Sequence, residues 1–214
     1  MKPSKIVLSI YKKDFKFLTK NLKDMINNNN IELIVTDINL KNHNKYFEVM
    51  KKYRDYAIIV INDDRIYSND LIKTLYNSYI DCPNCIHSRN VNKIMSLNNE
   101  ILSYNKWLKE YTFELNPSFN LLAITASGTL FPPNILDISD KNINEIKKCL
   151  REEDIYLKYL SITRNIKIKW APNKYLLGIR QLKDRNSQDK ILYEMNEKEE
   201  NLKNKCLLIF NTIK

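Results

Sequence analysis

The sequence predicts an α/β fold built on a parallel, doubly wound sheet. Short apolar runs alternate with segments of helical periodicity in the first part of the chain, which is the pattern of strand–helix–strand units. The chain has 214 residues, 43% of them apolar, which is enough for one buried core. Its 28% of charged residues is ordinary for a folded domain. We therefore expect one folded α/β domain.

Three strands are predicted in the first half, each a short, apolar, β-rich run. They are KIVLSI, IELIVT and YAIIVI, at residues 5–10, 31–36 and 56–61. Apolar residues then recur at helical spacing in three segments, from Phe15 to Ile26, Tyr46 to Tyr53 and Leu71 to Tyr79. Ser68 or Asn69 is expected to cap the third helix, with Asp70 in its first turn.

The second half of the chain is less regular. Strands are predicted at residues 85–91, 119–125 and 166–171, and the small residues and prolines of ASGTLFPP (126–133) predict a turn. Helices are predicted at residues 143–150 and 154–164. The charged tail, at about residues 188–205, is also expected to be helical.

The charge balance leaves several partners open. The net charge is +10, which would suit a polyanion. However, 25 acidic residues accompany the 35 basic ones, and no arginine-rich arm or aromatic RNA-binding motif occurs, so nucleic acid is not the favoured partner. A nucleotide diphosphate or an anionic lipid surface remains an alternative.

The cysteine pattern and the N-terminus predict a cytosolic protein. No apolar run approaches the roughly 20 residues that span a bilayer, and the apolar N-terminal stretch is too short for a secretory signal. Cys82 and Cys85 form a single CxxC, without the second pair that a zinc ribbon needs. Cys149 and Cys206 stand alone. We expect four free thiols in a reducing compartment.

Glycine is scarce, which restricts how phosphate could be bound. The chain contains two glycines, Gly128 and Gly178. A glycine-rich phosphate loop is therefore impossible. A divalent cation held by carboxylates is the expected substitute, because Mg²⁺ and Mn²⁺ bind one or two acids together with phosphate oxygens.

Acidic residues occur where such a cation could bind. Asn62, Asp63 and Asp64 follow the third predicted strand, and ligands of open α/β sheets bind at the carboxyl ends of strands. Glu153 and Asp154 precede an apolar helical stripe, where a carboxylate could act as a general base or simply favour the helix start. The two histidines, His43 and His87, lack ligand partners at useful spacing and are expected at the surface or in caps.

Four stretches together resemble bacterial glycosyltransferases of the GT-A fold, related to family 2 enzymes of capsule and lipopolysaccharide clusters. They are YAIIVINDDRIYSNDLIKTL, IHSRNVNKI, LLAITASGTLFPPNILD and REEDIYLKYLSITRNIKI, at residues 56–75, 86–94, 121–137 and 151–168. The resemblance implies one GT-A-like domain over residues 1–185, with a Rossmann-like, mostly parallel central sheet flanked by helices. Its nucleotide-binding half would be residues 1–80 and its acceptor half residues 81–185. Residues 186–214 would form a helical extension.

The resemblance also implies roles for the acidic residues. Asp64 would be the direct ligand of Mn²⁺ or Mg²⁺, and Asp63 would be the middle acid of the triplet. Asn62 stands where the family has its first Asp, and its neutral carbonyl holds a cation less strongly. Asp154 would be the catalytic base, with Glu153 as the alternative.

Four further residues are candidates for substrate binding. Lys45 is expected to contact phosphate. Arg89 could neutralise a diphosphate or orient a sugar carboxylate, although it could equally be a surface residue at a strand edge. Ser127 and Gly128 fall where small side chains let a sugar approach the backbone in the family.

The implied function is metal-dependent, inverting transfer of a sugar from a nucleotide-sugar donor to a hydroxyl group, in bacterial surface polysaccharide synthesis. The acceptor would be a glycan or a lipid-linked glycan, and the enzyme would be cytoplasmic or at the inner face of the membrane. An alternative hypothesis is a catalytically weak or inactive GT-A domain that serves as a nucleotide-sugar-binding or assembly module. Nucleic-acid binding is a third.

Overall fold

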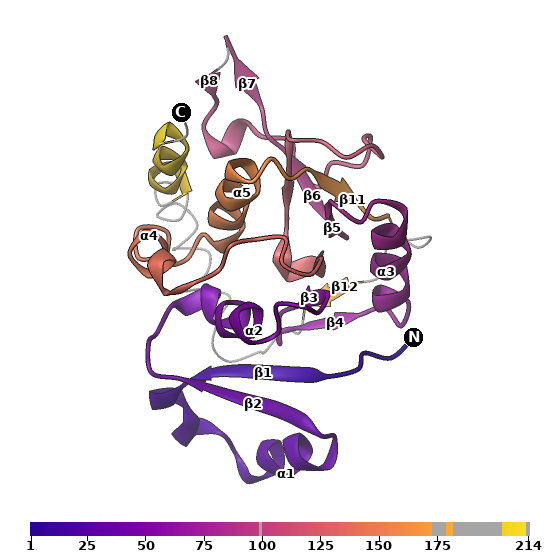
Figure 1. Cartoon of the computed structure of the whole chain (residues 1–214), viewed down its shortest axis with the longest axis vertical. Helices are drawn as coiled ribbons and strands as arrows, with labels where there is room; N and C mark the ends of the chain where they lie inside the picture. Colours follow the sequence, from indigo (N-terminus) through magenta and orange to yellow (C-terminus); the bar gives the residue numbers. More distant parts are fainter. Residues whose placement is uncertain (99, 173–178, 182–202, 213–214) are drawn as a thin grey trace.

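The computed structural model describes residues 1–98, 100–172, 179–181 and 203–212. They form a mixed α/β fold (Figure 1). Its main sheet has four strands in the order β11-β5-β10-β3. These strands are Ile168–Trp170, Ile86–Ser88, Thr129–Phe131 and Ile58–Val60.

The main sheet is mixed, so the predicted parallel sheet is wrong in its centre. Strand β10 runs antiparallel to both of its neighbours, β3 and β5, while β11 is parallel to β5. Strand β10 lies within residues 126–133, which the small residues and prolines predicted as a turn. Its three residues lie between Gly128 and two prolines, which are residue types that favour turns.

The first two predicted strands are confirmed, but they form a separate pair. Strands β1 (Ile6–Tyr11) and β2 (Ile31–Thr36) are parallel to each other. Within the described residues, neither is hydrogen-bonded to the main sheet. Figure 1 shows this pair as the lower layer of the molecule, with α2 (Phe47–Lys52) above it.

The remaining strands of the described residues form three small antiparallel sheets. They pair β4 (Arg65–Tyr67) with β12 (Ile179–Gln181), β6 (Val91–Lys93) with β9 (Leu121–Ala123), and β7 (Ser96–Leu97) with β8 (Glu100–Ile101). The strand predicted at residues 85–91 is therefore two short strands, β5 and β6.

The first predicted helix is divided into a 3₁₀ helix, η1 (Lys12–Phe17), and α1 (Lys20–Asn28). Thr19 separates them, because its side chain accepts a hydrogen bond from Leu22 N and so caps α1. The other helical segments, apart from α2, are η2 (Lys41–Lys45), α3 (Leu71–Asp81), η3 (Tyr104–Lys106), η4 (Thr125–Ser127), η5 (Asp140–Asn142), α4 (Ile143–Ile146), α5 (Glu153–Thr163) and η6 (Leu208–Thr212).

Two differences from the predicted helices concern their ends. Asp70 is the N-cap residue of α3, in place of Ser68 or Asn69. Helix α4 is shorter than the predicted residues 143–150. Residues 203–207 are helical, whereas the rest of the predicted helical tail and the boundary at 185 lie outside the described residues. The division into nucleotide-binding and acceptor halves stays a prediction.

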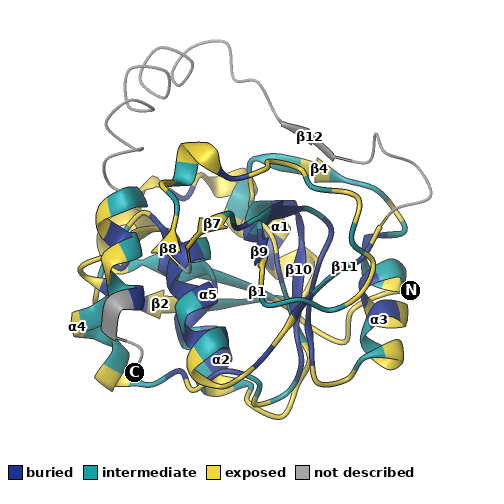
Figure 2. Cartoon of the chain, turned by 90° about the horizontal axis from the view of Figure 1, so that it is seen from above, coloured by how far each residue is buried: buried dark blue, intermediate teal, exposed yellow. Residues whose placement is uncertain are grey.

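The main sheet is packed on both faces, which explains its continuous apolar runs. On one face Val60, Ile86 and Phe131 belong to the same buried cluster as Ile155 of α5. On the other face Leu130 packs with Leu71 and Leu75 of α3, because successive strand residues point to opposite faces. Figure 2 shows β9, β10 and the inner side of α5 as buried.

Asparagine takes left-handed backbone positions in this glycine-poor chain. Asn30 and Asn165, which follow α1 and α5, have φ of 52° and 57°. Asn98 and Asn134 also have positive φ, of 50° and 54°. Asparagine tolerates this region better than other non-glycine residues, so the helices can end without glycine.

The cysteines form two disulfides, so the prediction of four free thiols is wrong. Cys82 is bonded to Cys85, and Cys149 to Cys206. The second pair is 57 residues apart in sequence, and the sequence alone could not show that the two residues meet. Their Cα atoms are 5.2 Å apart, which is within the usual range for a disulfide.

In the part of the chain that the structure describes, no helix is long and apolar enough to cross a bilayer.

Candidate functional site

The candidate site lies at the edge of the main sheet where three parallel strands end. Strands β3, β5 and β11 finish there at Val60, Ser88 and Trp170. Because β10 is antiparallel, it begins at the same edge, and Thr129 is paired with both Val60 and Ser88. The acidic stretch after β3 and the small-residue turn before β10 therefore lie beside each other.

A lysine joins two of the predicted site segments. Lys45 Nζ donates a hydrogen bond to Glu153 Oε1 at 2.7 Å and another to Asn62 Oδ1 at 2.9 Å. Asn42 Nδ2 donates to the second carboxylate oxygen of Glu153 at 2.9 Å. The last residue of η2, the loop after β3 and the start of α5 thus form one network, although over 100 residues separate Lys45 and Glu153 in sequence.

The Asp154 carboxylate is held by the turn before β10. Its Oδ1 accepts a hydrogen bond from Thr125 N at 3.0 Å and another from Thr125 Oγ1 at 2.7 Å. Two donors from one residue fix the orientation of the carboxylate. Asp154 therefore points from the first turn of α5 towards the carboxyl edge of the main sheet.

The two neighbouring acids have pKa values shifted in opposite directions. Burial raises the pKa of Asp154 to about 6, and the negative charge of Glu153 adds to this effect. Burial also opposes ionisation of Glu153, but the Lys45 ammonium outweighs it and lowers the Glu153 pKa. Lys45 therefore favours the ionised form of Glu153, while Asp154 can gain and lose a proton near neutral pH.

The acidic stretch after β3 is held by a tyrosine hydroxyl. Tyr67 Oη accepts a hydrogen bond from Asn62 N at 2.8 Å and donates one to Ala126 O at 2.8 Å. Tyr67 thus ties the loop after β3 to the turn that carries Thr125. Neither Tyr67 nor Thr125 is among the predicted site residues, since tyrosine and threonine in short strands and turns are common.

The acids of the triplet differ in their surroundings. Asp63 is exposed to solvent. Asp64 Oδ1 is buried and has no hydrogen-bond partner among the described residues. The oxygen of Asn62 already accepts a hydrogen bond from Lys45. An unpaired carboxylate oxygen suits a cation, so Asp64 fits the role of metal ligand, whereas an amide oxygen facing an ammonium group does not.

No ready-made cluster of metal ligands surrounds Asp64. Among the described residues, no group of three or more His, Cys, Asp and Glu side chains could hold a metal ion. A Mg²⁺ or Mn²⁺ ion at this place would need oxygen ligands from a substrate as well, which is the usual arrangement for a metal bound with a nucleotide phosphate.

Arg89 follows β5 at the same edge but is buried. Its side chain is 3% exposed, and Nη1 lies 3.9 Å from Asp70 Oδ1. The same Nη1 has no hydrogen-bond partner in the described part of the chain. Burial lowers the pKa of Arg89. The predicted alternative of a surface arginine at a strand edge is therefore wrong, whereas contact with a diphosphate stays a prediction.

The two small residues of the turn, Ser127 and Gly128, lie in closely packed surroundings. Ser127 is buried, and Gly128 has a φ of 95°, which favours glycine. A Cβ atom at position 128 would lie 2.7 Å from Leu71 Cδ1. Gly128 is thus explained by the packing of α3 against the turn, and a role of either residue in sugar binding stays a prediction.

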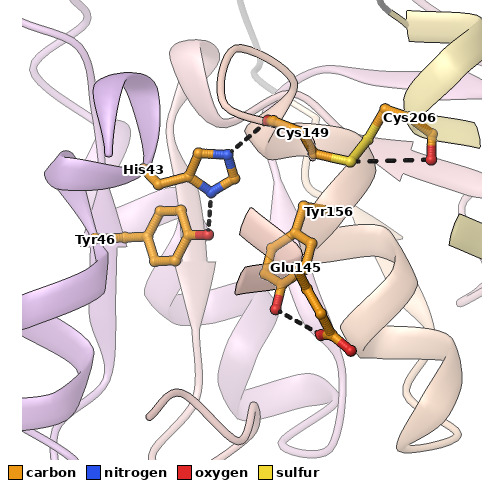
Figure 3. Close-up of a disulfide and its surroundings, with 6 residues drawn as sticks. All are labelled: His43, Tyr46, Glu145, Cys149, Tyr156 and Cys206. Carbon is orange, nitrogen blue, oxygen red and sulfur yellow. Dashed lines mark hydrogen bonds between the residues drawn. A yellow bond between two sulfur atoms is a disulfide. The ribbon is translucent and has the colours of Figure 1, made fainter. Parts of the chain in front are cut away.

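The two histidines are buried, contrary to the expectation of surface or capping positions. His43 Nδ1 lies 2.6 Å from the hydroxyl of Tyr46, and Nε2 lies 2.8 Å from the carbonyl oxygen of Cys149 (Figure 3). His87 is held in the same manner by Ser78 and the Cys82 carbonyl. Burial of the two imidazole rings is compensated, because each ring nitrogen has a hydrogen-bond partner.

The Cys149–Cys206 disulfide (Figure 3) restrains the backbone just before α5. Cys149 lies four residues before Glu153, and its carbonyl is hydrogen-bonded to His43 on η2. η2 also carries Asn42 and Lys45, which bind Glu153. The backbone before α5 is therefore fixed to the same element that holds the first acid of the helix.

A cavity of about 240 Å³ lies away from this site. Ile58, at the start of β3, and Phe131, at the end of β10, contribute to its lining, together with the exposed Arg54 and Arg164. These strand ends are at the opposite edge of the sheet from Thr129 and Val60. The cavity contains none of the candidate site residues.

No family model and no curated protein matches the chain. One solved structure that it resembles is the inositol-1-phosphate CTP transferase from T. maritima, with 12% identity over 91% of this chain and 75% of that chain. The TM-score is 0.38, which is too low for an inference about fold or function.

Proposed function

We propose that the protein is a glycosyltransferase that moves a sugar from a nucleotide-sugar donor to a hydroxyl acceptor. The observation that carries the proposal is the arrangement of Asp154 beside the Lys45–Glu153 pair, at the carboxyl edge of the main sheet. Open α/β sheets bind their ligands at this edge. The resemblance of residues 56–75 and 151–168 to GT-A enzymes selects the reaction.

Asp154 would act as the general base. Its pKa of about 6 leaves the carboxylate ionised at neutral pH and still basic enough to accept a proton. Thr125 holds Oδ1 through two hydrogen bonds. Asp154 would take the proton of the acceptor hydroxyl as that oxygen attacks the anomeric carbon from the side opposite the leaving nucleotide, which inverts the configuration.

The nucleotide diphosphate would lie near Lys45, Asn62 and Asp64. The Lys45 ammonium would attract the phosphates, and Asn62 would offer an amide for a hydrogen bond. Asp64 would hold a Mg²⁺ or Mn²⁺ ion, which supplies positive charge to stabilise the leaving diphosphate. Asp63, which is exposed, and Arg89 would add further contacts to the donor.

Release of nucleoside diphosphate from a panel of nucleotide sugars, with and without Mn²⁺, tests the proposal. Wild-type protein should turn over at least one donor. The Asp154→Asn variant should lose at least about a hundredfold in rate while nucleotide binding by calorimetry persists. Asp137→Asn, at an exposed position on the far cavity, is the matched control and should keep full activity.

Two results would contradict the proposal. One is no turnover of any donor together with no binding of any nucleoside diphosphate. The other is undiminished turnover by Asp154→Asn. Equal nucleotide affinity with and without Mn²⁺ would remove the metal from the proposal but leave the base assignment intact.

One observation favours a second candidate, a nucleotide-sugar-binding module without efficient catalysis. Asn62 stands where the resemblance expects a carboxylate, and its oxygen is already paired with Lys45, so it adds no acidic ligand to the one that Asp64 would supply. Binding of a nucleotide sugar without any release of nucleoside diphosphate would support this module. Turnover of any donor would exclude it.

A further inference from the structure

The N-terminal segment is rich in lysine. Residues 1–23 contain seven lysines and one acid, Asp14, so this short segment supplies six of the ten excess positive charges. Figure 1 shows that η1 and α1 lie with β1 and β2 in the lower layer, apart from α5. Residues 1–37, which form this layer, contain the same seven lysines and four acids, so five of its lysines lie close together in sequence on η1 and the first turns of α1.

Exposed aromatic side chains lie among these lysines. Phe17 is 71% exposed and Phe15 is 39% exposed. Lys16 Nζ lies 5.0 Å from the centre of the Phe17 ring, and Lys23 Nζ lies 5.4 Å from the centre of the Phe15 ring. The contact between Lys23 and Phe15 joins α1 to η1. We name this surface the N-terminal patch; its residues are Lys12, Lys13, Phe15, Lys16, Phe17, Lys20 and Lys23.

Acids near the N-terminal patch do not cancel its charge. Asp14 and Asp24 are exposed within the same segment, and Asp37 is 3.1 Å from Lys12. This last pair is exposed on both sides, and such pairs contribute little energy. The N-terminal patch therefore has five lysines and two phenylalanines, with three acids nearby, and keeps a net positive charge.

We propose that the N-terminal patch binds the surface of an anionic phospholipid membrane. Lysines attract acidic headgroups, and aromatic rings can enter the boundary between headgroups and acyl chains. Both groups are exposed here, and each ring has a lysine beside it, Lys16 at Phe17 and Lys23 at Phe15. Charge alone would equally suit a nucleic acid, but the phosphate backbone of a duplex offers no apolar surface to the interleaved Phe15 and Phe17. A single strand, whose bases can stack on aromatic rings, is the competing ligand in the experiment.

Co-sedimentation of the full chain with phosphatidylcholine vesicles, with and without phosphatidylglycerol, tests the proposal. Wild-type protein should bind only the vesicles that contain phosphatidylglycerol, and added salt should weaken binding. Lys13→Glu with Lys16→Glu should lower partitioning by at least about tenfold. Phe15→Ser with Phe17→Ser should lower it about tenfold as well.

Two matched variants control for charge and apolar area. Lys147→Glu with Lys148→Glu reverses two exposed lysines near α4, and Phe113→Ser removes a side chain that is 86% exposed. Neither variant should change binding. Circular dichroism checks that each variant is folded, and the single substitution Phe17→Ser provides a milder variant if the double one is not.

Three outcomes would overturn the proposal. The first is no binding of wild-type protein to phosphatidylglycerol vesicles. The second is equal loss of binding in the control variants. The third is undiminished vesicle binding by the phenylalanine variants together with tighter retention on single-stranded DNA, which would assign the N-terminal patch to nucleic acid.

Discussion

Helix α5 buries charged groups in two regions that differ in their partners. In its first turn, Glu153 is buried, but it is paired with Lys45 and hydrogen-bonded by Asn42. Lys158, further along the same helix, is 1% exposed, and its ammonium nitrogen has no hydrogen-bond partner among the described residues. Burial lowers the pKa of Lys158 to about 7.

The two regions differ in whether the buried charge has a partner. At the start of α5 the partners come from η2 and from the loops at the carboxyl edge of the sheet, so burial adjusts pKa values without leaving a charge alone. Lys158 lines a small, mostly apolar internal cavity together with Asp154 and Thr125, but no described residue forms a hydrogen bond with its ammonium group. A buried charge with a partner is largely compensated, whereas a buried charge without one destabilises the fold.

The largest expected effect comes from breaking the paired region. Lys45→Met should leave the Glu153 carboxylate buried beside Asp154 without its cation. Loss of one partner of a buried pair costs about 3–5 kcal/mol, so the free energy of unfolding in urea at neutral pH should fall by about that amount. Lys147→Met, at an exposed position, is the control and should change stability by less than about 0.5 kcal/mol. An equal, small effect in both variants would show that the pair is not buried in solution.

The sequence could predict the acids of this region but not their partners. Asp64, Glu153 and Asp154 stand out because strand-end and helix-start positions can be read from hydrophobic periodicity. Thr125 and Tyr67 do not, since they act through contacts between segments that are 29 and 59 residues apart. Such contacts depend on the order of strands in the sheet.

The same limit applies to the fold. Strands β1 and β2 and helices α2, α3 and α5 follow the predicted runs closely, because each contrasts clearly with its flanks. Strands β3 and β11 were predicted in the right place but are three residues within runs of six. Strand β10 was not predictable, although it is the strand that joins β3 to β5. Pairing with neighbours on both sides outweighs the turn-forming tendency of the small residues before it.

A smaller effect of opposite sign is expected for the unpaired region. Lys158→Met removes the buried ammonium and keeps an unbranched side chain of similar length. The variant should be more stable than wild type by about 2 kcal/mol at pH 6. The measurement is the free energy of unfolding in urea.

The pH dependence of that difference gives a sharper test. The folded pKa of Lys158, about 7, is below its ordinary value of 10.5. Between these values the unfolded chain holds a proton that the folded chain has lost, so wild-type stability rises with pH. The advantage of Lys158→Met should therefore be greatest below pH 7 and decline towards pH 10. A constant advantage over this range would mean that Lys158 is charged and paired in solution.

The smallest expected effect concerns the coupling of Glu153 to Asp154 within the paired region. Burial is the main cause of the raised Asp154 pKa, and the Glu153 charge is the second. Glu153→Gln keeps an oxygen for Lys45 and Asn42 but removes the negative charge. The Asp154 pKa, followed by ¹³C NMR of the side-chain carboxyl, should fall from about 6 towards its ordinary range, whereas Glu48→Gln on α2 should leave it unchanged.

If Asp154 is the base, the rise of activity with pH should move to lower pH by the same amount. An unchanged Asp154 pKa in Glu153→Gln would mean that burial alone sets it, and that the two acids act independently.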